Sequence, residues 1–176
     1  HSPDWAELVK TTADAISLSP HKCGGLRGHG VLIVHDLTSR LRPLARGGGQ
    51  EHGLRPGTQS PALAAANALA IEQAANEVAM RAANMAAVRD AFVRGVRASL
   101  VEHEVMTPLA TSLPNTVMLR FPHVDGRNLL PALDLAGIHA SHGSACSSGA
   151  PTPPRILLAM GLSEAAARTC VRFSFG

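Results

Sequence analysis

Residues 13–34 read ADAISLSPHKCGGLRGHGVLIV, and their two apolar segments give the first indication of the fold. Ala13–Ser19 is predicted to form a short buried strand that stops at Pro20. Four glycines then make a turn-rich link into Val31–Val34. This run of four aliphatic residues, three of them β-branched, predicts a second buried strand. Lys22 comes directly after the first strand, and ligands of α/β sheets bind where strands end.

Lys22 is a candidate for covalent chemistry. Only Lys10 and Lys22 are lysines among the 16 basic residues. Lysine can lose its proton and form a Schiff base, whereas arginine stays protonated. We expect Lys22 to be partly removed from water, which would lower its pKa and let it act as nucleophile and base. Ser19 and His21 can donate hydrogen bonds to a phosphate. On composition alone, chance retention of two lysines is the simpler interpretation.

A loop is predicted from Thr38 to Thr58, with three glycines at positions 47–49. The bare glycine amides, the Arg55 guanidinium and the Thr58 hydroxyl are groups that can cradle an anion. A flexible surface loop without a ligand is the alternative interpretation of the same residues.

A long helix is predicted from Pro61, with Ser60 as its cap, to about His103. Its length predicts a bend or a break. Arg89 is expected to lie off the apolar stripe that faces the core. The residues of that stripe are Val78, Met85, Val88, Phe92, Val96 and Leu100.

The last third of the chain alternates strands and helices. Asn115–Phe121 and Thr169–Phe175 are predicted strands, each with apolar residues on one face. Helices are predicted at 125–137 and at 155–160. Arg172 falls on the polar face of the final strand, beside Cys170 and Ser174. It could clamp a carboxylate through two parallel hydrogen bonds, or it could form an ordinary salt bridge.

Cys146 lies in a run of small residues at 143–149. Such a loop leaves a thiol accessible, and an exposed thiol with a lowered pKa is reactive. The alternative is an idle surface cysteine. Cys23 and Cys170 adjoin or lie in strands and are interpreted as structural. Three cysteines without CxxC spacing argue against a disulfide framework and a zinc site, and they suit a reducing cytoplasm.

Composition excludes several classes of function. Hydrophobic residues make up 45% of the chain, but aromatic residues only 3%, so aliphatic side chains must build the core. No apolar run approaches the ~20 residues of a membrane span. The formal charge of +3 is mild. It does not call for nucleic acid, so direct nucleic-acid binding is not expected.

Five motifs occur in a specific order: SPHK at 19–22, GGGQE with RPGT at 47–58, SHGSACSSG at 141–149, LLAMGL at 157–162 and VRFSFG at 171–176. In this combination the chain resembles the group I (NifS/IscS-type) cysteine desulfurases. These belong to the class V aminotransferase family of fold-type I pyridoxal-phosphate (PLP) enzymes. The resemblance runs from about Asp14 to Gly176, and the segment around Cys146 is its most specific part.

The resemblance implies a role for each matching residue. Lys22 would bind PLP covalently, and Ser19 and His21 would contact its phosphate. Thr58 would reach the PLP phosphate of the neighbouring subunit, which implies a homodimer. Cys146 would be the nucleophile that accepts sulfur as a persulfide. Arg172 would bind the carboxylate of L-cysteine, and no metal is implied.

The implied architecture is α/β: the end of a large PLP-binding domain at 1–59, a long connecting helix at 60–103 and a small C-terminal α+β domain at 104–176. The implied activity, in the cytoplasm, is conversion of L-cysteine to L-alanine with transfer of sulfur to an acceptor protein. Iron–sulfur clusters, tRNA thiolation and DNA sulfur modification all draw on such enzymes.

The sequence departs from the family pattern at three positions. Pro20 stands where glycine is usual, Arg46 where histidine is frequent, and Pro56 lies inside the RxGT motif. None of these changes removes a functional group. The family's cofactor-binding aspartate, glutamine and histidine upstream of Ser19 have no counterpart here. We therefore expect a C-terminal fragment that binds PLP poorly, and is inactive, by itself.

Two other functions remain open at this level. Another PLP-dependent lyase or aminotransferase would leave Cys146 incidental to the reaction. A non-catalytic scaffold for sulfur transfer would not need the cofactor.

Overall fold

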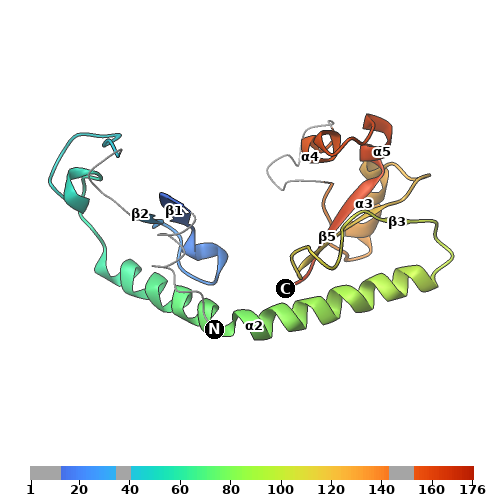
Figure 1. The fold of residues 1–176 in the computed structure, drawn as a ribbon, viewed down its shortest axis with the longest axis horizontal. Helices are drawn as coiled ribbons and strands as arrows, with labels where there is room; N and C mark the ends of the chain where they lie inside the picture. The colour runs from blue at the N-terminus through green and yellow to red at the C-terminus, as the bar shows by residue number, and fades with distance from the viewer. Residues whose placement is uncertain (1–12, 35–40, 143–152) are drawn as a thin grey trace. The chain divides into compact units, whose positions relative to one another are not determined.

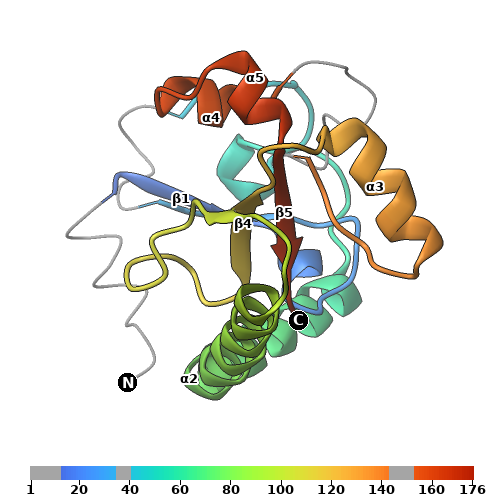
Figure 2. The same cartoon turned by 90° about the vertical axis from the view of Figure 1, so that its right-hand side faces the viewer.

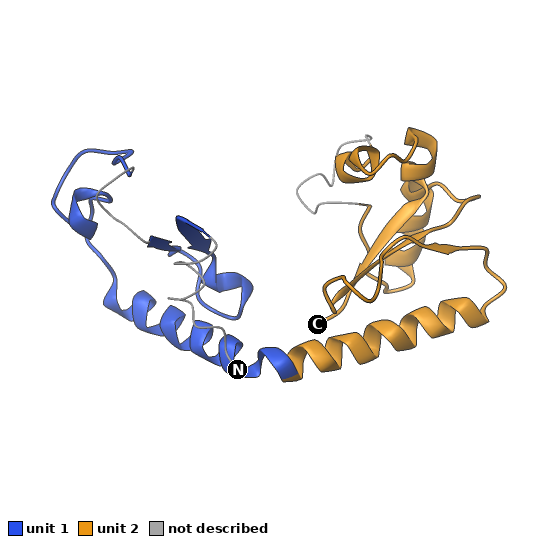
Figure 3. Ribbon diagram, in the orientation of Figure 1, with its two compact units in different colours: residues 1–79 blue, residues 80–176 orange. Residues whose placement is uncertain are grey.

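The computed structural model describes residues 13–34, 41–142 and 153–176. The chain forms two compact units, residues 1–79 and residues 80–176 (Figure 3). Helix α2, Pro61–Ala98, which is labelled in Figure 1, contributes residues to both units (Figure 3). The predicted division into segments 1–59, 60–103 and 104–176 concerns domain roles that these units do not test, and it stays a prediction.

The first unit contains an antiparallel strand pair. Strand β1, Ala15–Leu18, pairs with β2, Val31–Val34, so that Leu18 lies opposite Val31. Both predicted strands are therefore present. The prediction that they are buried is wrong for this chain, because β1 alternates exposed and half-buried residues and Leu32 is 56% exposed. A pair of strands has too few neighbours to cover both of its faces.

Helix α2 begins at Pro61 as predicted, and the Ser60 hydroxyl accepts a hydrogen bond from the Leu63 amide at 3.4 Å. The helix ends at Ala98, five residues before the predicted end at His103. Ser99 provides the reason, because its hydroxyl donates to the Val96 carbonyl at 2.6 Å and so competes for the carbonyls of the last turn. The sequence predicts a bend or a break: α2 is one continuous helix, so it has no break, and the bend stays a prediction.

The buried face of α2 in the second unit differs from the predicted stripe. Val88 and Leu100 are exposed, whereas Val93 is 2% exposed. Arg89, expected off the stripe, is only 6% exposed. Its guanidinium pairs with Asp90 at 2.9 Å and donates to the Leu113 carbonyl at 3.4 Å. The neighbouring Asp90 and the distant Leu113 carbonyl together let a charged side chain occupy a core-facing position.

The second unit is built on an antiparallel sheet in the order β3–β4–β5. Its strands are β3 (Glu104–Val105), β4 (Thr116–Arg120) and β5 (Cys170–Ser174). The two longer strands fall within the predicted segments, and β3 was not predicted.

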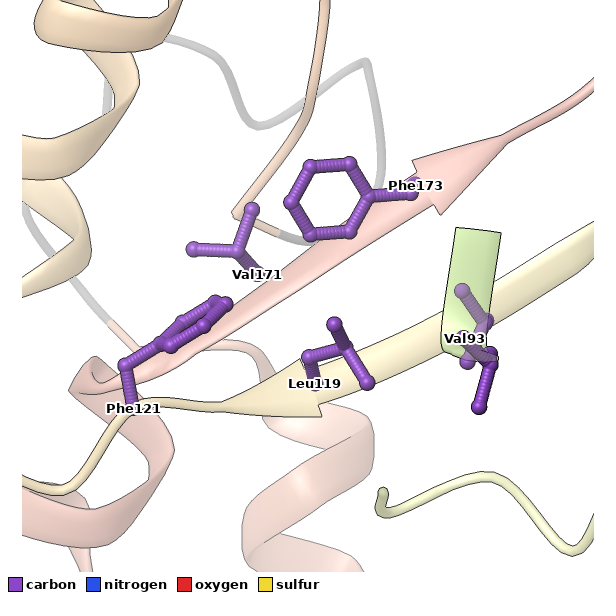
Figure 4. Close-up of a cluster of buried hydrophobic side chains, with 6 residues drawn as sticks. Val93, Leu119, Phe121, Val171 and Phe173 are labelled. Carbon is purple, nitrogen blue, oxygen red and sulfur yellow. The ribbon is translucent and has the colours of Figure 1, made fainter. Parts of the chain in front are cut away.

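One face of β4 and β5 carries the core (Figure 4). Val117, Leu119 and Val171 have no exposed surface. Phe173 packs against Phe92 of α2, with ring centroids 4.7 Å apart. The alternation predicted for the two strands is thus confirmed on this face.

Three short helices complete the described part of this unit. Helix α3, Gly126–Leu135, lies beside β5 (Figure 2). Its cap is Asp125, which accepts from the Arg127 amide at 2.8 Å. Hydrogen bonds from the Arg127 side chain lower the pKa of Asp125 from 3.8 to about 2.

The other two helices, α4 (Arg155–Ala159) and α5 (Glu164–Arg168), pack against Cys170. Helix α5 was not predicted. Cys170 is fully buried against Leu157 and Ala167, so its assignment to a polar face is wrong. Burial raises the pKa of the Cys170 thiol, which is consistent with a structural role. No helix among the described residues is long and apolar enough to cross a membrane.

We expect Leu119→Ala to lower the free energy of unfolding by about 2–5 kcal/mol, because Leu119 is fully buried in the core. Urea denaturation of the intact protein measures this change. Leu100→Ala is the matched control, since Leu100 is fully exposed. Equal effects of the two substitutions would contradict the assigned core.

Candidate active site

The candidate lysine lies in a tight turn that follows β1. The 3₁₀ turn Pro20–Lys22 begins two residues after the strand ends. The Pro20 carbonyl accepts hydrogen bonds from the amides of Cys23 and Gly25, each at 2.9 Å, and the Lys22 amide donates to the Ser19 carbonyl at 2.9 Å. Pro20 itself is fully buried. These hydrogen bonds and the buried proline therefore fix the backbone that carries Lys22.

The side chains on this turn are open to solvent. Ser19, His21 and Lys22 are all exposed, so the expected partial desolvation of Lys22 is not present in this chain. Within the described residues their side chains form no hydrogen bond or ion pair. A hydroxyl, an imidazole and an amine are thus available together.

A cavity of about 350 Å³ adjoins the turn. Lys22, Ser19 and Cys23 line one side, and the other side is a row of apolar residues on α2. This row consists of Ile71, Ala74, Ala75 and Val78. The spacing puts these residues on one face of the helix. Lys22 therefore lies at the edge of a largely apolar cavity.

The glycine-rich loop is cross-linked by its own side chains. The Gly57 amide donates to the Gln50 side-chain oxygen at 3.3 Å, and the Gln59 amide group donates to the Glu51 carboxylate at 2.6 Å. Thr58 lies between these two links and is exposed. Thr58 has no hydrogen bond to the Lys22 turn within the described chain.

The same loop holds two residues in the left-handed region of backbone conformation. Glu51 has φ 49° and His52 has φ 57°. Residues other than glycine rarely adopt this conformation, and the surrounding structure must compensate for its cost. The two side-chain links supply that compensation, and sequence reasoning gave no signal for the strain.

Arg172 is placed in the middle of β5. Its amide donates to the Ser141 carbonyl at 2.7 Å, and its carbonyl accepts from the Ser141 amide at 3.0 Å. The Arg172 side chain is half-buried, and its Nε atom is buried without a hydrogen-bond partner among the described residues. Leaving a buried charged donor unpaired costs free energy. The site therefore suits an anionic ligand that supplies the missing acceptor.

Cys146 and the rest of 143–152 lie outside the described residues, so its predicted role stays a prediction. The residue before this segment is fixed. His142 donates from Nδ1 to the Cys170 carbonyl at 2.7 Å. It also fits closely against Gly126, where an added Cβ would lie 2.7 Å from Nδ1. Sequence reasoning missed His142, although its position at the edge of the small-residue loop was a usable signal.

The structure thus groups Ser19, His21, Lys22 and Thr58 in the first unit and Arg172 in the second. The roles assigned to these residues remain predictions.

Solved structures place the fold in a known class. A NifS-like protein aligns with 93% of this chain and 41% of its own length, at a TM-score of 0.78 and 33% identity. DndA from Streptomyces lividans aligns with 99% of this chain and 50% of its own, at a TM-score of 0.70 and 28% identity. SspA in complex with cysteine gives a TM-score of 0.68 at 29% identity, with coverage of 99% and 48%. The predicted α/β class of fold-type I aminotransferases is confirmed.

Sequence comparison then gives the family. The aminotransferase class-V profile matches residues 6–176, and the chain belongs to this family. Cysteine desulfurase IscS of Dictyoglomus turgidum is 34% identical over 93% of this chain, and cysteine desulfurase NifS of Azotobacter vinelandii is 36% identical over 96%. These alignments cover 41% and 42% of the two relatives. The chain therefore spans about two fifths of the length of the curated relatives it matches.

The residues present fit the PLP that this family uses. The Lys22 amine, which has no partner among the described residues, is suited to a covalent link, and the exposed Ser19 and His21 side chains offer donors beside it for a phosphate. Pro20, the first residue of the turn, is fully buried. Lys22, Ser19 and His21 are the residues that would hold the cofactor.

We expect Gly25→Ala to destabilise the protein by about 1–3 kcal/mol and to weaken PLP binding, because the turn has no room for a methyl group. An added Cβ would lie 2.6 Å from Asn67 Oδ1 and 2.9 Å from the Pro20 carbonyl oxygen. Urea denaturation and visible-absorbance titration with PLP measure the two effects. Gly95→Ala is the control, since its methyl group would meet nothing within 4 Å. Unchanged PLP affinity in Gly25→Ala would separate the turn from the cofactor site.

Proposed function

We propose that this protein is a PLP-dependent L-cysteine desulfurase that converts L-cysteine to L-alanine and transfers the sulfur to Cys146. One observation carries the proposal. The chain matches relatives named cysteine desulfurases over more than 90% of its length. It also has a lysine on a hydrogen-bonded turn and a cysteine in a segment of small residues. The complex of its relative SspA with cysteine supports the substrate class.

Lys22 has two tasks in this proposal. Its amine holds the cofactor covalently and, once released, takes up and returns the proton at the substrate Cα. PLP, when bound, acts as an electron sink for the negative charge that develops at Cα. Ser19 and His21 hold the phosphate group. The exposed position of all three side chains on one short turn supports this division of labour.

Arg172 is proposed to bind the substrate carboxylate. Guanidinium and carboxylate groups can form two parallel hydrogen bonds, which fix orientation as well as position. The buried Nε without a partner supports this role, because a bound carboxylate would supply the acceptor that the described chain lacks.

Cys146 is proposed to act as the nucleophile. Its thiolate attacks the substrate sulfur, the carbon–sulfur bond breaks, and the sulfur stays on Cys146 as a persulfide. The remaining carbon skeleton takes up a proton and leaves as alanine. Support for this step comes from the sequence at 143–149 and from the relatives' names.

The proposal extends to partners and location. Thr58 would contact the PLP phosphate of a second subunit, which makes the enzyme a homodimer in the cytoplasm. The exposed position of Thr58 and the lack of a hydrogen bond to the Lys22 turn support a role outside its own site. An acceptor protein would take the sulfur onward to iron–sulfur clusters, tRNA thiolation or DNA sulfur modification.

We expect Cys146→Ser to abolish sulfide release from L-cysteine while PLP remains bound, because serine cannot form a persulfide. Sulfide and alanine assays on the intact protein, together with the visible spectrum, measure both properties. Cys23→Ser is the matched control, since the serine hydroxyl can keep the hydrogen bond that the Cys23 thiol donates to the Pro20 carbonyl. Continued formation of alanine and sulfide by Cys146→Ser would instead favour another PLP-dependent lyase.

We expect Arg172→Gln to raise KM for L-cysteine roughly 10- to 100-fold, the loss typical of one charge-assisted hydrogen-bonded pair. Steady-state kinetics measure this change. Arg120→Lys on the neighbouring strand is the control, because Arg120 is already paired with Glu104 at 2.8 Å. An unchanged KM in Arg172→Gln would mean that another residue binds the carboxylate.

A further inference from the structure

Asn67 is a buried polar residue that the proposed mechanism does not use. It lies on α2 and is only 2% exposed. Its side-chain oxygen accepts a hydrogen bond from the Leu26 amide at 2.8 Å, across 41 residues of sequence. Because the Leu26 amide can only donate, the contacting atom of Asn67 must be Oδ1. This bond joins α2 to the end of the turn that carries Lys22.

Helix α2 packs closely against the segment that follows the turn, at Gly25. Gly25 fits between Asn67 and Pro20, so closely that a Cβ there would meet both. The Pro20 carbonyl accepts from the Cys23 and Gly25 amides, and the Cys23 thiol also donates to it at 3.1 Å. The turn is therefore one hydrogen-bonded unit, and Asn67 is its side-chain link to the helix.

The chemistry of Asn67 indicates that its oxygen is the important atom. The Nδ2 group is buried and has no hydrogen-bond partner among the described residues. An unsatisfied buried donor is destabilising. A leucine would fill the same space without that cost, but it would leave the Leu26 amide without an acceptor. The residue is thus suited to holding Leu26 rather than to packing.

We propose that Asn67 is a positioning residue for Lys22. Its hydrogen bond with the Leu26 amide fixes the segment from Ser19 to Leu26, which includes the turn, against α2. The Lys22 amine is thereby held in one position. This inference rests on the proposed function only for the role of Lys22. The link itself is a property of the protein without cofactor, and small displacements of a reacting group can lower rates about 100-fold.

The test uses Asn67→Leu, which removes the acceptor, and Asn67→Asp, which is isosteric and keeps an oxygen at Oδ1. Asn76→Leu is the matched control, because it makes the same change at an exposed position of the same helix. Amide hydrogen exchange at Leu26 is measured in the intact protein without cofactor. With cofactor, kcat and KM for L-cysteine are measured separately.

In the wild type and in Asn76→Leu, the Leu26 amide is expected to be protected from exchange. In Asn67→Leu we expect exchange at Leu26 to be at least about 10-fold faster, and kcat to fall about 10-fold with KM within about twofold. KM should stay nearly unchanged because Arg172, and not the turn, is proposed to bind the substrate. Asn67→Asp should restore protection of Leu26 and most of kcat.

Other results would overturn the inference. Free exchange of Leu26 in the wild type would show that the link does not exist in solution, even if Asn67→Leu fails to fold. Loss of the link with unchanged kcat would make Asn67 merely structural. If the link behaves as expected but the wild type releases no sulfide, the proposed function fails and the link stands.

Discussion

The carbonyl oxygen of Pro20 is the point on which the candidate site depends. It accepts from the Cys23 and Gly25 amides and from the Cys23 thiol, while the proline ring is fully buried. These hydrogen bonds fold the segment that follows β1 into a compact turn, and this turn carries the exposed Lys22 side chain. A mobile lysine would lose much of its catalytic value, because reactivity depends on holding the reacting atoms in a narrow range of geometry.

The second unit solves a related problem in a different way. Arg172 is positioned by regular structure, since β5 pairs with β4 on one side and its backbone bonds with Ser141 on the other. Alternation along β5 sends Val171 and Phe173 into the core and leaves Arg172 on the other face. The same strand thus anchors the fold and carries a guanidinium whose Nε has no partner in the part of the chain that the structure describes.

Short-range patterns predicted much of this architecture. The valines of β2, the Ser60–Pro61 start of α2 and the alternation in β5 each reflect a rule that acts within a few residues. The failures depend on partners distant in sequence. The burial of Arg89 requires the Leu113 carbonyl, and the burial of Cys170 requires α4 and α5. At the site, motifs marked Lys22 and Arg172, whereas nothing local connects Asn67 with Leu26.

The 41-residue separation between Leu26 and Asn67 has a consequence for the newly made chain. Synthesis adds about 5–20 residues per second, so the turn remains without its partner on α2 for roughly 2–8 s after Leu26 has been added. During that interval the lysine segment can form only its local hydrogen bonds. The nascent polypeptide therefore fixes this turn against α2 only after the first part of the long helix has been translated.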